Sequence, residues 1–246
     1  QLRVLTALAA DPQATALYLS PTKALGADQL RAVTELTMME PELSTVAACA
    51  YDGDTSTEMR QWARRHSRWI FTNPDMLHVS LLPGHARWAR MLRRLKYVVI
   101  DECHSYRGVF GSHVALILRR LRRLARHYGA DPVFILASAT TGEPADAASR
   151  LIGAPCRAVT EDGSPHGPRT VAMWEPPLLR EVTGEHGAPV RRAAGTEAAR
   201  LLADLVVEGA RTLTFVRSRH GAELTAMGAR RLLAAAAPDL VDRVAA

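Results

Sequence analysis

Cysteine is scarce in this sequence, and long apolar runs are missing. The three cysteines, Cys49, Cys103 and Cys156, are odd in number and far apart, which excludes a disulfide framework and a zinc knuckle. No apolar run approaches the roughly 18 residues that a membrane helix needs, and no charged-then-apolar leader is present at the start. We therefore expect a cytoplasmic protein with no membrane partner.

Lysine is almost absent as well. Only Lys23 and Lys96 among the 31 basic residues are lysines, yet abundant arginine gives the chain a net charge of +6. An excess of positive charge favours polyanionic partners, because each basic side chain can displace a counterion from a phosphate. Since 48% of the 246 residues are apolar, the chain can also build a substantial core. The composition predicts a globular protein that favours a polyanionic partner.

Short apolar stretches alternate with longer amphipathic ones over the first 160 residues. The predicted strands are 16–20, 46–50, 69–72, 97–100 and 133–138. The predicted helices are 28–39, 58–65, 85–95, 112–128 and 143–151. This alternation predicts an α/β fold, in which a parallel sheet carries helices on both faces.

The alternation breaks at 161–169, where turn-forming residues replace apolar ones. We interpret this stretch as a linker between a first domain, 1–160, and the beginning of a second domain, 170–246. In the second domain we predict strands at 170–174 and 212–216 and a helix at 196–208. This part too is expected to be α/β.

Two adjacent carboxylates, Asp101 and Glu102, follow the predicted strand 97–100. Such carboxylates repel each other unless a cation or a proton lies between them, and a nucleotide-bound Mg²⁺ is such a cation. We predict that Asp101 binds Mg²⁺, directly or through water, and that Glu102 orients the water that attacks the γ-phosphate of ATP. His104 is expected to sense this site and couple it to movement. The alternative is a pair of acids that caps the next helix.

Other polar clusters follow other predicted strands. In open parallel sheets the ligand lies beyond the carboxyl ends of the strands, so these clusters are expected to share one edge. Ser138 and Thr140 follow the strand next to the acids and are predicted to connect them with His104. An ordinary helix cap is the alternative for these hydroxyls.

Two of the clusters are typical of helix starts that hold phosphates. Thr22 with Lys23, and Thr72 with Asn73, place polar side chains beside free backbone N–H groups. We predict that these four residues, together with Asp54 after the strand 46–50, hold the backbone of a single strand of nucleic acid. Each cluster is also a competent helix start without any ligand.

Aromatic and basic residues follow the acids. Tyr106, Arg107 and Phe110 lie in a glycine-containing segment, where aromatic rings can stack on unpaired bases. We predict that they report occupancy by nucleic acid, and packing of the two rings into the core is the alternative. The basic positions Arg119, Arg120, Arg122, Arg123 and Arg126 lie opposite the apolar face of their predicted helix. They are interpreted as a solvated face, with direct contact to DNA as the alternative.

In this order the clusters resemble the motifs of superfamily 2 DExH helicases. Pro-Thr-Lys-Ala-Leu at 21–25 resembles motif Ia, Thr-Asn-Pro-Asp-Met-Leu at 72–77 motif Ic, Asp-Glu-Cys-His at 101–104 motif II, Ser-Ala-Thr at 138–140 motif III, and Phe-Val-Arg-Ser-Arg at 215–219 motif IV. Finer stretches, such as Tyr-Asp-Gly-Asp-Thr at 51–55 and Tyr-Arg-Gly-Val-Phe-Gly-Ser-His at 106–113, are similar to the bacterial MrfA (YprA) and eukaryotic Hrq helicases. The resemblance spans nearly the whole chain.

The resemblance implies a RecA-like fold, ATP and Mg²⁺ as cofactors, and single-stranded or forked DNA as the partner. It also implies 3′ to 5′ movement, a role in DNA repair, and contact of the strand with Arg217 and Ser218 of motif IV. The alternatives are an RNA helicase of the same superfamily and a non-catalytic remnant that binds nucleic acid. A DNA helicase and an RNA helicase are distinguished by whether DNA or RNA stimulates ATP hydrolysis.

The sequence departs from the family in lacking the Gly-x-x-x-x-Gly-Lys-Ser/Thr phosphate loop. Motifs V and VI and a C-terminal domain with cysteines are also missing, and the chain begins with Gln1 rather than Met. We therefore expect a piece of a longer enzyme that hydrolyses little or no ATP by itself.

Overall fold

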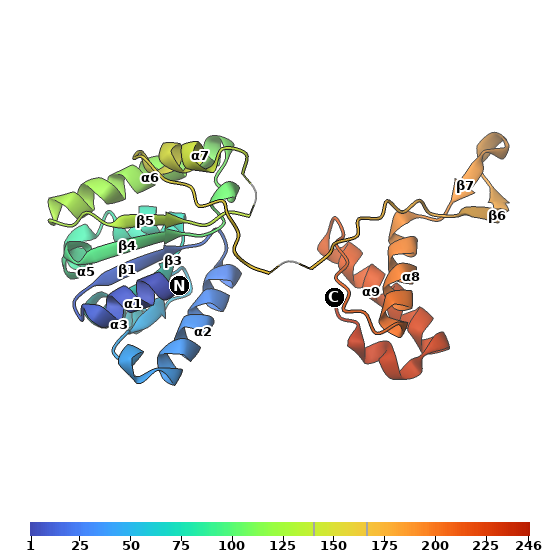
Figure 1. Cartoon of the computed structure of the whole chain (residues 1–246), viewed down its shortest axis with the longest axis horizontal. Helices are drawn as coiled ribbons and strands as arrows, with labels where there is room; N and C mark the ends of the chain where they lie inside the picture. The colour runs from blue at the N-terminus through green and yellow to red at the C-terminus, as the bar shows by residue number, and fades with distance from the viewer. Residues whose placement is uncertain (140, 166) are drawn as a thin grey trace. The chain divides into compact units, whose positions relative to one another are not determined.

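The computed structural model describes residues 1–139, 141–165 and 167–246. The chain forms two compact units, Gln1–Asp162 and Gly163–Ala246, which are described separately (Figure 1). The division falls inside the segment 161–169, whose described residues form neither helix nor strand. The assignment of domains to these units stays a prediction.

The first unit is built on a parallel sheet of five strands. They are β1 (Thr15–Leu19), β2 (Ala48–Ala50), β3 (Trp69–Thr72), β4 (Leu95–Ile100) and β5 (Val133–Leu136), in the order β2-β3-β1-β4-β5. Each lies where the sequence predicts a strand, with ends that differ by up to two residues. The predicted α/β fold with a parallel sheet is confirmed.

Helices connect the strands and pack on both faces of the sheet (Figure 1). They are α1 (Leu2–Ala10), α2 (Lys23–Met39), α3 (Thr57–His66), α4 (Pro74–Met76), α5 (Ala89–Arg93), α6 (Gly108–His127) and α7 (Pro144–Ile152). A single turn of π-helix, Leu77–Leu81, and 3₁₀ turns at Pro41–Leu43, His85–Trp88 and Cys103–Ser105 complete the connections. The predicted helix 85–95 is wrong in extent, because the chain forms a 3₁₀ turn before α5 and enters β4 at Leu95.

Alternating side chains of the strands divide the core into two layers, as the pleat of a strand requires. Leu17 and Leu19 of β1 pack with residues of α5, α6 and α7 on one face. Ala16 and Tyr18 of the same strand pack with residues of α1 and α2 on the other. Burial on both faces explains why β1 and β3 are apolar almost throughout.

Arg68, just before β3, is a buried cation, and no acidic side chain among the described residues is bonded to it. Its guanidinium donates to the carbonyl oxygens of Leu8 at 2.5 Å, Asp11 at 2.6 Å and Ala14 at 3.3 Å. Burial lowers the pKa of this guanidinium, and the nearby charge of Asp11 opposes that shift. Arg68 thus ties the end of α1 and the turn after it to the sheet, and it satisfies the Leu8 carbonyl that the helix leaves free.

Replacement of Arg68 by Met should lower the free energy of unfolding of the chain by about 3 kcal/mol, because several buried carbonyl groups lose their donor. Urea denaturation followed by circular dichroism measures this loss. Arg65→Met, at an exposed position of α3, is the matched control and should change stability little. Equal stability of the two variants would contradict the role given to Arg68.

The second unit contains a small antiparallel hairpin and two long helices. They are β6 (Leu178–Thr183), β7 (Pro189–Arg191), α8 (Ala194–Val207) and α9 (Arg219–Ala236), followed by the 3₁₀ segment Pro238–Arg243. The 3₁₀ turn Glu185–Gly187 connects the two strands. Helix α8 corresponds to the predicted helix 196–208. Among the described residues of the whole chain, no helix is long and apolar enough to cross a membrane.

The predicted strands 170–174 and 212–216 are wrong, since neither segment forms a strand. A strand needs a neighbour for its backbone groups, and the described part of this unit offers only the β6–β7 pair. The apolar side chains of Leu213 and Phe215 are 78% and 86% exposed. Trp174 is held instead by its side chain, whose indole Nε1 donates to Glu197 Oε1 at 3.1 Å.

Candidate functional site

Three of the polar clusters lie side by side at the carboxyl edge of the sheet. A small cavity of about 40 Å³ is lined by residues that follow β1, β2 and β3, among them Lys23, Asp52 and Asn73. The acids follow β4, which pairs with β1 along its length. The structure therefore brings these groups to one edge.

The segment Asp101–Cys103 is fixed at this edge by backbone hydrogen bonds to both neighbouring strand ends. The N–H of Asp101 donates to Leu19 O, and the N–H of Cys103 donates to Ala137 O, each at 2.9 Å. Glu102 has a left-handed backbone, with φ 47° and ψ 42°, which is uncommon for a residue other than glycine. Its N–H donates to Asp101 Oδ1 at 3.0 Å and supports this turn. The turn at Glu102 is therefore held both by backbone hydrogen bonds and by the Asp101 carboxylate.

Tyr18 of β1 makes a contact with the acids that the sequence analysis missed. Its phenol hydroxyl donates to Asp101 Oδ2, while its ring stacks on Phe71 with a centroid distance of 4.8 Å. Burial raises the pKa of the Tyr18 hydroxyl, and the hydrogen bond to Asp101 adds to the rise. The alternation of side chains within β1 indicates which face of the sheet Tyr18 lies on. The sequence does not show that β4, which carries Asp101 at its end, lies next to β1.

His104 lies between the acids and the loop that follows β5. Its Nδ1 is 3.2 Å from Glu102 Oε2 and 3.3 Å from Ser138 Oγ. Ser138 Oγ is also 2.9 Å from the hydroxyl of Thr141. An Nδ1 that carries a hydrogen can donate to the carboxylate, whereas an Nδ1 without one accepts from the hydroxyl, so the tautomer of the ring sets the pairing. Thr140, which was predicted to act with Ser138, lies outside the described residues.

Thr22 and Lys23 begin α2. The Thr22 hydroxyl caps the helix by accepting from the N–H of Leu25 at 3.3 Å. Lys23 Nζ lies 2.6 Å from Asp54 Oδ2, and this hydrogen bond raises the pKa of the Lys23 ammonium group. Both charged side chains are largely exposed, so the pair is weak and can open. Arg60 shapes the loop that carries Asp54 by donating to the carbonyl oxygens at 52, 53 and 55.

Thr72 and Asn73 have different surroundings although they are neighbours. Thr72 is buried, and its hydroxyl donates to Tyr51 O at 2.6 Å, so this hydroxyl is already paired. Asn73 Oδ1 caps α4 by accepting from the N–H of Met76 at 2.9 Å. The Asn73 side chain is only partly buried, which leaves its amide group as the more accessible of the two.

The two aromatic rings after the acids differ in burial, although their centroids are only 5.8 Å apart. Tyr106 is 7% exposed and belongs to the core, and no hydrogen-bond partner for its hydroxyl occurs among the described residues. Burial raises the pKa of this hydroxyl. Phe110 is 47% exposed at the start of α6, and Arg107 is exposed. The alternative of core packing thus describes Tyr106 but not Phe110.

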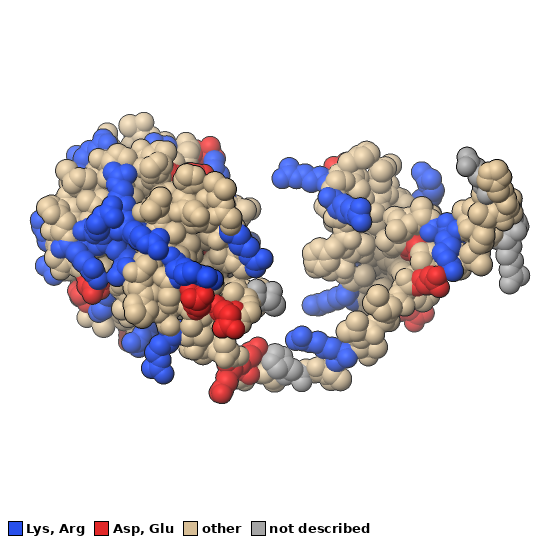
Figure 2. Space-filling view, turned by 90° about the horizontal axis from the view of Figure 1, so that it is seen from above, with Lys and Arg blue, Asp and Glu red and all other residues tan. Residues whose placement is uncertain are grey.

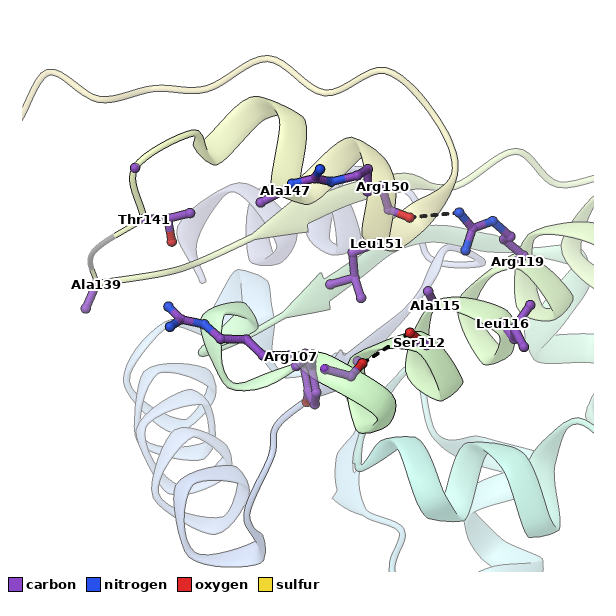
Figure 3. Close-up of a pocket in the computed structure, with 14 residues that line it drawn as sticks. Arg107, Ser112, Ala115, Leu116, Arg119, Ala139, Thr141, Ala147, Arg150 and Leu151 are labelled. Carbon is purple, nitrogen blue, oxygen red and sulfur yellow. Dashed lines mark hydrogen bonds between the residues drawn. The ribbon is translucent and has the colours of Figure 1, made fainter.

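A groove of about 1310 Å³ lies beside these residues (Figure 3). Arg107 lies on one side of it, α6 contributes Ala115 and Leu116, and α7 contributes Arg150 and Leu151. The groove is open to solvent and is lined by both cationic and apolar side chains.

The basic face of α6 has structural contacts as well as solvent contacts. Lys and Arg side chains gather on the face of the first unit where α6 and α7 lie (Figure 2). Arg119 donates to Arg150 O at 2.8 Å, and Arg122 donates to Ile152 O at 3.0 Å and to Gly153 O. The interpretation of this face as merely solvated is therefore incomplete, because two of its arginines hold the end of α7.

In the second unit, Ser218 caps α9 by accepting from the N–H of Gly221 at 3.0 Å. Arg217 is exposed immediately before it. These two residues are described within their own unit only.

The family model and the relatives that match this chain are all helicases. A model of the DEAD/DEAH box helicase matches residues 1–148. The chain is 41% identical over 223 residues to YprA of Bacillus subtilis, which is named as an uncharacterized ATP-dependent helicase. The matched residues make up 91% of this chain and 29% of YprA. The chain is also 39% identical over 248 residues to the ATP-dependent helicase HRQ1 of Saccharomyces cerevisiae. This match covers 99% of this chain and 23% of HRQ1.

Solved structures resemble the whole chain. The DUF1998 helicase MrfA bound to DNA and AMPPNP superimposes with a TM-score of 0.83 at 39% identity, over 99% of this chain and 32% of MrfA. The chain therefore spans about a quarter to a third of the length of these proteins.

Proposed function

This chain belongs to the DEAD/DEAH box helicase family, and we propose that it is part of an ATP-dependent DNA helicase that moves 3′ to 5′ and serves DNA repair. The observation that carries the proposal is the arrangement of Asp101, Glu102 and His104 at the end of β4, beside Ser138. The polarity and the repair role rest on the family resemblance.

In this proposal Asp101 holds Mg²⁺ and Glu102 orients the attacking water. Among residues 1–139, 141–165 and 167–246, no three His, Cys, Asp or Glu side chains gather as a metal site. That fits Mg²⁺, which in nucleotide sites takes one or two carboxylates and completes its shell with phosphate oxygens and water. Bound there, Mg²⁺ supplies positive charge that offsets the charge of the phosphates. The different contacts of the two carboxylates support these separate roles, because Asp101 Oδ2 accepts from the Tyr18 hydroxyl while Glu102 Oε2 lies 3.2 Å from His104 Nδ1.

His104 is proposed to couple this site to movement. Its Nδ1 reaches both Glu102 and Ser138, and the tautomer of the ring decides whether it donates to the carboxylate or accepts from the hydroxyl. A change of partner at His104 therefore transmits a change at the acids to the loop after β5. The loop continues into α7 and the segment that leads to the second unit.

The nucleic-acid strand is proposed to lie over Thr22, Lys23 and Asn73 at the same edge. The Lys23–Asp54 pair supports this placement, because both side chains are exposed and a phosphate can replace Asp54 as the partner of the ammonium group at little cost. MrfA has been solved with DNA, which favours DNA over RNA as the partner of this chain.

The proposal is tested by ATP hydrolysis in the full-length protein that carries this chain. Single-stranded DNA should stimulate hydrolysis at least about tenfold more than RNA of the same length and sequence, because DNA completes the site while RNA does not fit it equally well. Phosphate release is measured as each strand is titrated. Lys23→Ala should raise the DNA concentration for half-maximal stimulation, and raising the salt concentration should reduce its difference from the wild type.

Three outcomes bear on the alternatives. Stronger stimulation by RNA would replace the proposal with an RNA helicase. Binding of DNA without any ATP hydrolysis would indicate the non-catalytic remnant. An unchanged DNA titration in Lys23→Ala would move the strand away from the start of α2.

A further inference from the structure

We propose that Tyr18 is a positioning residue for Asp101, and that its hydroxyl fixes the carboxylate in the orientation that binds Mg²⁺. This inference rests on the proposed function. Tyr18 lies on β1, three residues before Pro21, where the motif 21–25 begins. Tyr18 is not among the functional residues that the sequence analysis predicts.

The carboxylate of Asp101 is held at both oxygens. Tyr18 donates to Oδ2 through its hydroxyl, and the N–H of Glu102 donates to Oδ1 at 3.0 Å. Two donors on different oxygens remove the rotation that a carboxylate at a strand end would otherwise have. An ionised carboxylate has about four acceptor positions, so the remaining ones stay available to a cation or its water.

The hydroxyl of Tyr18 is itself rigidly placed. The side chain is only 3% exposed, and its ring stacks on Phe71 of β3. Strand β1 pairs with β3 on one side and with β4 on the other, with Leu19 opposite Ile100. A donor fixed in this way does not have to reorganise when the cation binds, which is the condition for effective electrostatic placement.

A merely structural hydrogen bond is the competing explanation. Asp101 is only partly buried, so water can replace the phenol hydroxyl if it is removed. The loss of stability should then be small, whereas the orientation of the carboxylate should no longer be fixed. Metal dependence, rather than folding, is the property that separates the two explanations.

The test is Tyr18→Phe in the full-length protein, because phenylalanine keeps the ring and its stacking on Phe71. The Mg²⁺ concentration for half-maximal ATP hydrolysis should rise about tenfold, as expected for one lost hydrogen bond to a charged group. The rate at saturating Mg²⁺ should fall less than about threefold, since Glu102 still orients water. A second readout needs no hydrolysis: binding of a fluorescent non-hydrolysable ATP analogue is titrated with Mg²⁺ and should show the same shift.

The matched control is Tyr128→Phe. Its hydroxyl also has one side-chain partner, His85 Nδ1 at 2.8 Å, but it lies just after α6, away from the acids. This variant should leave the Mg²⁺ titration unchanged. In an Asp101→Asn background, Tyr18→Phe should cause no further shift in analogue binding, because its effect acts through that carboxylate.

An unchanged Mg²⁺ titration for Tyr18→Phe, with a normal wild-type rate, overturns this inference and leaves the proposed function intact. Absence of ATP hydrolysis in the wild-type protein overturns the proposed function instead. Equal shifts in Tyr18→Phe and Tyr128→Phe, or an additive shift in the double variant, would also contradict a direct role of Tyr18. Circular dichroism of each variant checks that the fold is kept.

Discussion

Replacement of Glu102 by Gln should reduce ATP hydrolysis by the full-length protein at least about 100-fold, because the amide cannot polarise the attacking water as a carboxylate does. Binding of the nucleotide and of DNA should persist, since glutamine has the same size and Asp101 is unchanged. Single-turnover phosphate release measures the chemical step, and analogue binding measures the ground state.

The left-handed backbone of Glu102 makes this variant informative. Its support comes from the backbone N–H and Asp101 Oδ1, a contact that glutamine retains. Glu35→Gln, at an exposed position within α2, is the control for loss of a negative charge and should keep the wild-type rate. A Glu102→Gln protein that hydrolyses ATP within a few-fold of the wild type would remove Glu102 from the proposed mechanism.

The 246-residue chain prepared by itself should hydrolyse ATP at least about 1000-fold more slowly than the full-length protein. The reason is the missing phosphate loop, whose lysine and backbone N–H groups hold the β- and γ-phosphates in this class of enzyme. Without that loop to hold the phosphates, Asp101 and Glu102 cannot position the nucleotide. Phosphate release at saturating DNA is the measurement.

Folding of the isolated chain has to be checked in the same experiment. A native circular dichroism spectrum together with background ATP hydrolysis supports the prediction. Turnover of the isolated chain near the full-length rate would contradict it, and would mean that another part of these 246 residues holds the phosphates.

Much of the first unit could be predicted because local patterns determine it. Short apolar runs ending in turns predicted all five strands, and the resemblance to superfamily 2 helicases of the MrfA/YprA and Hrq type is confirmed, as is the RecA-like fold. The clustering of polar residues after strands followed from the parallel order of the sheet. The roles of the individual residues stay predictions.

The second unit shows where local patterns are insufficient. The segment 212–216 alternates apolar and polar residues, which favours a strand, yet Leu213 and Phe215 remain exposed there. A strand forms only if another strand satisfies its backbone groups, and a sequence pattern does not contain that partner.

The sequence by itself determined which residue types follow each strand, and hence the family and the edge at which polar groups gather. Only the tertiary structure decided which of these groups touch. Tyr18 and Asp101 are 83 residues apart in the chain and meet because β1 lies between β3 and β4. The same packing paired the Thr72 hydroxyl with Tyr51 O and Lys23 with Asp54. Periodicity is a local property of the chain, whereas these contacts depend on the order and register of strands that are distant in sequence.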